Sequence, residues 1–82
     1  MKLPVIRQIQ RTCTPEEIEI AIKVLELASE ASGLKEEETD VIGELLSNMC
    51  GALEVYQLIK EGAAEKDAGN LFMKKVLASI DQ

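Results

Sequence analysis

Cys13 and Cys50 carry the most nucleophilic side chains of this 82-residue chain. The sequence contains no histidine, so the usual general base near neutral pH and the usual partner of a catalytic cysteine are both missing. Cys13 directly precedes a predicted helix start, where the helix dipole favours a thiolate, and Arg11 adds a positive charge nearby. A small thiol-dependent redox sensor or enzyme that uses Cys13 is therefore one hypothesis for the function.

The remaining residues give little support for a metal or cofactor site. The two cysteines lie far apart in the sequence and cannot alone complete a four-ligand zinc site. Glu44 and Glu54 are predicted to project from the side of their helix that faces away from the core, so they do not converge on a metal ion. Cys50 is predicted to act as a small apolar side chain at a helix–helix contact. We therefore predict a protein without catalytic activity, cofactor or bound metal.

A capping box marks the start of the first main helix. In the run Thr14-Pro15-Glu16-Glu17, the threonine suits the cap, the proline suits the first helical position and the second glutamate completes the box. A helix is predicted over residues 15–32, and Gly33 ends it. The segment before it is ambiguous, because Pro4 suits a helix start while the apolar residues around it also fit the period of a strand.

Two further helices complete a predicted single all-α domain over residues 1–82. They cover residues 36–61 and 65–80, and the short connections make neighbouring helices of the bundle antiparallel. The helix over 36–61 would be about 39 Å long, so we expect the other helices to pack against it. Its predicted core seam follows the spacing of knobs-into-holes packing and consists of Ile42, Leu45, Met49, Ala52, Tyr56 and Ile59.

Apolar and small residues also occupy helix faces outside this core. The helix over 15–32 has a second apolar stripe where an ordinary surface helix has one. The helix over 36–61 has a row of small residues, which indicates a close backbone approach because glycine inside a helix costs about 1 kcal/mol relative to alanine. The candidate interface residues are Ile20, Val24, Leu27, Gly43, Ser47, Gly51, Val55 and Leu58. Either a second subunit or the N-terminal segment of the same chain could lie against the small-residue row.

The length of the chain favours self-association. In a domain of 82 residues, the burial of apolar surface only just offsets the cost of ordering the chain. Burial of the second stripe against another molecule would add a decisive share of a net stability of about 5–15 kcal/mol. We predict a homo-oligomer, with a dimer favoured, and a different protein partner as the alternative.

Charge is distributed unevenly along the chain. The net charge is −6, and all fifteen acidic residues follow residue 13, whereas Lys2, Arg7 and Arg11 precede it. The acidic body would repel a phosphate backbone, so no nucleic-acid binding is predicted. The basic segment is predicted to dock on an acidic helix of its own or a neighbouring chain, with an acidic partner as the alternative.

The sequence also favours a cytoplasmic location. No run approaches the ~20 apolar residues of a membrane span, so we predict no membrane contact. The run Leu3-Pro4-Val5-Ile6 is too short for the apolar core of a secretory signal. The cysteines are then expected to be reduced thiols.

Three runs carry a resemblance to a known group of proteins. Met1-Lys2-Leu3-Pro4-Val5-Ile6-Arg7, Asp40-Val41-Ile42-Gly43-Glu44-Leu45 and Gly51-Ala52-Leu53-Glu54-Val55 resemble those of a small family of uncharacterised bacterial proteins of about this length. The resemblance covers most of the chain and implies a bacterial cytoplasmic protein, but no activity or site residue. The function is therefore unknown, and we favour a small self-associating structural or protein-interaction module over thiol chemistry at Cys13.

Overall fold

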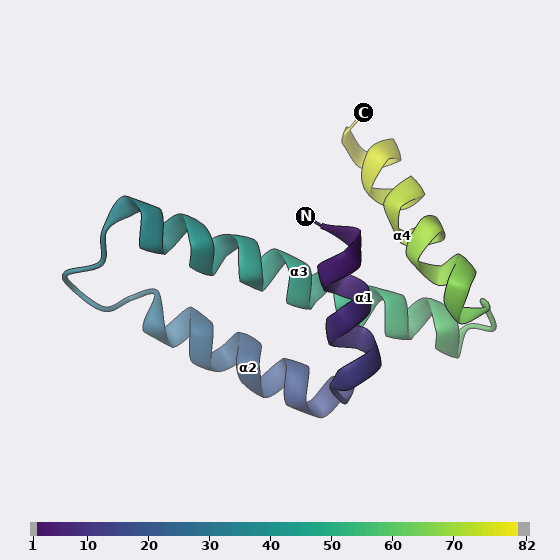
Figure 1. Cartoon of the computed structure of the whole chain (residues 1–82), viewed down its shortest axis with the longest axis horizontal. Coiled ribbons are helices and arrows are strands. Elements are labelled where there is room, and N and C mark those ends of the chain that lie inside the picture. Colours follow the sequence, from purple (N-terminus) through teal and green to yellow (C-terminus); the bar gives the residue numbers. More distant parts are fainter. Residues whose placement is uncertain (1, 81–82) are drawn as a thin grey trace.

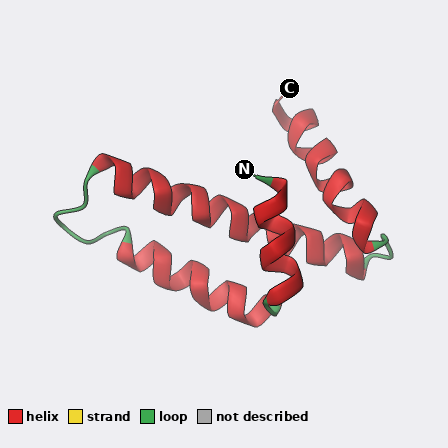
Figure 2. Ribbon diagram, in the orientation of Figure 1, coloured by secondary structure: helices red, strands yellow, loops and turns green. Residues whose placement is uncertain are grey.

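Four helices make up nearly all of residues 2–80, the part of the chain that the computed structural model describes. They are α1 (Leu3–Thr12), α2 (Pro15–Ala28), α3 (Glu36–Lys60) and α4 (Glu65–Ile80). No strand occurs among the described residues (Figure 2). The prediction of an all-α fold is confirmed, and the ambiguous N-terminal segment is a helix.

Local hydrogen bonds explain where α2 begins and ends. The Thr14 hydroxyl accepts from the Glu17 backbone N–H at 3.1 Å, and the Thr14 backbone N–H donates to the Glu17 carboxylate at 2.8 Å. The predicted capping box is therefore present. α2 ends at Ala28 rather than at residue 32. The Ser29 hydroxyl donates to the carbonyl oxygen of Glu26 at 2.6 Å, and such side-chain bonds compete with helix continuation.

Two glycines in left-handed conformations allow the chain to leave α2 and α3. Gly33 lies between these helices with φ of 89°, and Gly62 follows α3 with φ of 110°. Such angles are unfavourable for residues with a Cβ atom. α3 ends at Lys60, close to its predicted end, and α4 has its predicted bounds.

α3 contacts each of the other three helices (Figure 1). α2 runs antiparallel beside its N-terminal half, α1 crosses it near the middle, and α4 turns back over its C-terminal half at a marked tilt. The predicted antiparallel arrangement thus describes the α2–α3 hairpin well and α4 only loosely. α1 also packs against α4, where the side chains of Leu3 and Arg7 lie beside Gly69.

The core lies where α1 crosses α3, and all four helices contribute to it. The buried apolar residues are Ile6, Ile18, Ala52, Val55, Ala68 and Phe72. The predicted seam of α3 is only partly correct. Ala52 is buried, and Met49, Tyr56 and Ile59 pack around the core, but Leu45 is exposed and is not a core residue. The seam fails at Leu45 because α1 covers α3 only from Asn48 onward.

Polar contacts fix both ends of α1 on α3. At its start, the Lys2 backbone N–H donates to Oδ1 of the buried Asn48 at 3.0 Å. At its end, the Tyr56 hydroxyl donates to the carbonyl oxygen of Gln10 at 2.6 Å and also to that of Cys13. The Lys2 ammonium lies 3.7 Å from the Glu44 carboxylate. The start of the basic segment therefore docks on the acidic helix of its own chain.

Candidate interaction surface

The second apolar stripe of α2 is open to solvent. Ile20, Val24 and Leu27 retain exposed fractions of 64%, 58% and 59%. The other stripe of the same helix faces α3, with Ile18 buried and Ile22 packed against the core. α2 therefore presents apolar side chains on a side that no other described helix covers.

The small-residue row of α3 divides into a covered part and an open part. A Cβ atom added at Gly51 would lie 2.9 Å from Ile6 Cδ1 and 3.2 Å from Phe72 Cζ, so α1 and α4 both approach closely there. Val55 is buried, and Leu58 is half-buried against the core. By contrast, nothing lies within 4 Å of a Cβ atom added at Gly43, and Ser47 is exposed.

The chain's own N-terminal helix therefore occupies the close-approach site at Gly51. Gly51 and Val55 are buried. At this part of the row, the N-terminal segment of the same chain lies in the position for which a second subunit was the alternative. Ile20, Val24, Leu27, Gly43 and Ser47 remain accessible.

Polar and charged side chains gather on one side of the α2–α3 hairpin. Glu16 and Glu19 of α2 share a hollow with Gln57 and Lys60 of α3, which places these four side chains on the same side of the hairpin. With 100° per residue, the opposite side of α2 carries Val24 and Ala28, and the opposite side of α3 carries Val41 and Leu45. Ile20 and Leu27 point away from α3, at the outer edge of this side and next to Glu16 on the helical wheel. We name the surface formed by Ile20, Val24, Leu27, Val41 and Leu45 the open hairpin face.

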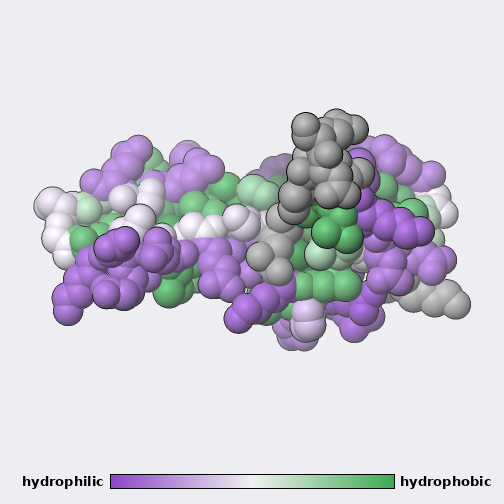
Figure 3. All heavy atoms as spheres, turned by 90° about the horizontal axis from the view of Figure 1, so that it is seen from above, coloured by the Kyte–Doolittle hydropathy of each residue, from purple (hydrophilic) through white to green (hydrophobic). Residues whose placement is uncertain are grey.

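The open hairpin face continues on α3 into the contact with α1. One row of side chains along α3 follows helical spacing and consists of Val41, Leu45, Asn48, Ala52 and Val55. Their exposed fractions are 55%, 38%, 2%, 0% and 1% in this order. The row is thus covered from Asn48 onward and uncovered before it. Apolar side chains accordingly reach the surface at the hairpin end, among hydrophilic ones (Figure 3).

The sequence contains a signal for this surface, although Leu45 is also part of the predicted core seam. The positions 41, 45, 48, 52 and 55 follow the 4-3-4-3 spacing of a single helix face. A hollow of about 360 Å³ beside Val41, lined by Leu34, Glu37, Glu38, Val41 and Ile42, extends the apolar side toward the loop.

The whole chain exposes more surface than a globular monomer of its size. Its accessible surface is 5762 Å², against about 4,850 Å² expected for 9.0 kDa. The radius of gyration is 13.7 Å, against about 11.7 Å expected for a domain of this length. The shortest dimension is 18 Å, which corresponds to two layers of helices. The excess of about 900 Å² reflects a thin, extended arrangement.

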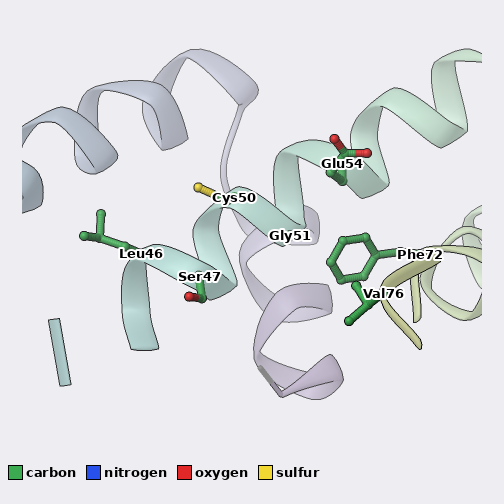
Figure 4. A pocket seen from close by; sticks show the side chains of 7 residues that line it. All are labelled: Leu46, Ser47, Cys50, Gly51, Glu54, Phe72 and Val76. Atoms are coloured by element: carbon green, nitrogen blue, oxygen red, sulfur yellow. The ribbon is translucent and has the colours of Figure 1, made fainter. Parts of the chain in front are cut away.

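A second apolar hollow lies between α3 and α4 (Figure 4). It measures about 320 Å³ and is lined by Leu46, Ser47, Cys50, Gly51, Glu54, Phe72 and Val76. The Phe72 ring lies against Gly51. Cys50 is exposed at this hollow, so the prediction that it sits inside a helix–helix contact is wrong. α4 leaves α3 at a tilt and does not cover Cys50.

Cys13 has no catalytic partners among the described residues. Its thiol is half-buried against the core, and its Sγ lies 3.7 Å from the Thr12 hydroxyl oxygen. It precedes the cap residue Thr14 and so lies outside the first turn of α2, where the helix dipole acts most strongly. The described part of the chain also has no group of three histidine, cysteine or acidic residues that could hold a metal ion.

No helix in the described part of the chain has both the length and the apolar character that a membrane crossing requires.

Comparison with known proteins gives a family but no function. No curated protein and no solved structure matches the chain. A family model matches residues 1–81, which confirms the resemblance to an uncharacterised family. The chain belongs to the family of unknown function DUF6952.

Proposed function

We propose that this protein is a small structural or protein-interaction module that acts by self-association, as a homodimer, and not by catalysis. The observation that carries the proposal is its excess surface of about 900 Å² over a globular monomer. Stable interfaces bury about 800 Å² per partner. One additional contact of ordinary size would therefore bring the chain to the surface area normal for its mass.

Exposed apolar side chains support the same proposal. Among the residues whose burial the structure describes, seven large apolar ones are exposed, and five of them form the open hairpin face. Contiguous exposed apolar patches on soluble proteins commonly mark interaction sites. The net charge of −6 makes nucleic acid an unfavourable partner. The free thiols of Cys13 and Cys50 suit a reducing compartment, so we propose a cytoplasmic location.

The test is the mass of the purified full chain in solution. Light scattering or sedimentation from about 1 to 100 µM is expected to give twice 9.0 kDa, and the melting temperature is expected to rise with concentration. A mass of 9.0 kDa throughout this range, with a constant melting temperature, would overturn the proposal.

A further inference from the structure

Along one row of side chains, the uncovered part of α3 is apolar as the covered part is, but no described helix lies over it. Val41 and Leu45 lie on the same row as Ala52 and Val55, one or more turns nearer the hairpin end. Over Ala52 and Val55 the row is closed by the apolar side of α1, an amphipathic helix that crosses α3. The open hairpin face therefore has the shape and chemistry of a helix-packing surface that lacks its second layer.

No described segment of the chain can supply this layer. α1 begins at Leu3, and its start is held at Asn48 by the Lys2 backbone N–H, while the Lys2 side chain lies beside Glu44. α1 therefore stops before it reaches Leu45. α4 packs over the C-terminal half of α3, away from the hairpin end (Figure 1).

We propose that the open hairpin face is covered by the same face of a second copy, so that two α2–α3 hairpins form a four-helix arrangement. This inference rests on the proposed self-association and names its site. A contact of one patch with the identical patch on a second copy is the commonest way to form a closed dimer. Such a symmetric contact needs no apolar surface other than the open hairpin face.

The chemistry of the face also fits a second copy better than a charged partner. Its five large side chains are apolar, Glu16, Glu19 and Lys60 lie on the other side of the hairpin, and Glu37 and Glu38 line the hollow at its edge beside Val41. Two copies that meet through the apolar side keep these charges in water. This matters because each copy carries a net charge of −6 and would repel the other through its acidic side.

The test compares charged substitutions inside and outside the face. Val24→Glu and Leu45→Glu place a carboxylate on the open hairpin face, on α2 and α3 respectively. Leu71→Glu is the matched control, because Leu71 lies on α4 and its exposed fraction of 41% is close to the 38% of Leu45. All three variants change the net charge equally, and all three residues are exposed enough for the monomer fold to tolerate the change. Circular dichroism checks helix content.

The inference predicts a dimeric wild type and a dimeric Leu71→Glu variant, together with dissociation constants raised about ten-fold or more in Val24→Glu and Leu45→Glu. If one hairpin variant fails to fold, the other carries the test. If the wild type and both hairpin variants are equally dimeric, or if Leu71→Glu alone dissociates, the interface lies elsewhere; this inference is then wrong, while the proposed self-association stands. A monomeric wild type overturns both.

Discussion

One row of side chains along α3 carries apolar residues in both halves of the helix, but the two halves have opposite environments. Near the hairpin end, Val41 and Leu45 face solvent, whereas Ala52 and Val55 of the same row are buried. The difference comes from α1, a helix of ten residues that crosses only one half. Burial along α3 is therefore decided by how far the neighbouring helix extends. The apolar pattern alone does not distinguish the two halves.

The strongest test of this difference is the removal of the side chain that closes the covered half. Ile6 is fully buried and contacts Gly51. Ile6→Ala is expected to lower the free energy of unfolding by about 2–5 kcal/mol, through lost burial and the cavity left behind. Val41→Ala, on the open half, is expected to change the stability of the monomer by less than about 0.5 kcal/mol, because Val41 is exposed. Urea unfolding at a concentration where the chain is monomeric measures both values. Similar losses in the two variants would show that the open half is as well packed as the covered one.

The two glycines of the small-residue row allow a matched comparison. Gly51→Leu is expected to destabilise the fold by about 1–3 kcal/mol or more, because its first side-chain carbon already meets Ile6 and Phe72. Gly43→Leu introduces the same side chain where nothing lies within 4 Å of the first carbon. It is expected to be neutral or stabilising, since leucine has the higher helix propensity. Thermal unfolding of both variants distinguishes the sites, and an unchanged melting temperature in Gly51→Leu would contradict the close packing of α1 on α3.

A smaller effect is expected at the C-terminal end of α1. The Tyr56 hydroxyl donates to the carbonyl oxygens of Gln10 and Cys13. Tyr56→Phe removes these bonds and keeps the ring, so the expected loss is about 0.5–1.5 kcal/mol. Amide hydrogen exchange should show the loss of protection mainly in α1. A loss confined to α2 would mean that the hydroxyl does not hold α1 in place.

The smallest effect concerns the two thiols. Cys50→Ala is expected to change stability by no more than about 0.5 kcal/mol, because Cys50 is exposed. The double variant Cys13→Ser with Cys50→Ala is expected to retain its fold under reducing conditions, although Cys13 packs against the core. In the wild type, a thiol reagent near neutral pH should modify Cys50 faster than Cys13. Rapid reaction of Cys13 would instead favour the alternative function of a thiol-dependent sensor.

The sequence was sufficient for the helices because their ends depend on local chemistry. The capping box at Thr14 and the glycines at positions 33 and 62 act within a few residues, and each lies where it was expected. The early end of α2 at Ala28 was not predicted. The predicted end was based on Gly33, whereas the hydrogen bond from the Ser29 hydroxyl to the Glu26 carbonyl oxygen acts earlier in the chain. Membership of an uncharacterised family was also predicted correctly. A bacterial source, a dimer and a cytoplasmic location remain predictions.

The packing was harder to predict because it depends on which helix covers which face. A helical wheel shows that Leu45 and Ala52 share a face, but it does not show that α1 covers only the second of them. A helical wheel also does not show which molecule covers a face, which explains why Val55 was predicted to be an interface residue. It does lie at a close contact, but the contact is with α1 of its own chain. The exposed stripe of Ile20, Val24 and Leu27 was identified because nothing in the chain was available to cover it.

The hydrogen bond between Lys2 and Asn48 has a consequence for how a family with this fold can change. It sets the point on α3 where coverage by the chain's own first helix begins. A longer or shorter first helix would move that point and alter the apolar area left for other molecules. The strength of association could thus vary between relatives through a few residues at the start of the chain, while every residue of the surface that associates stays the same.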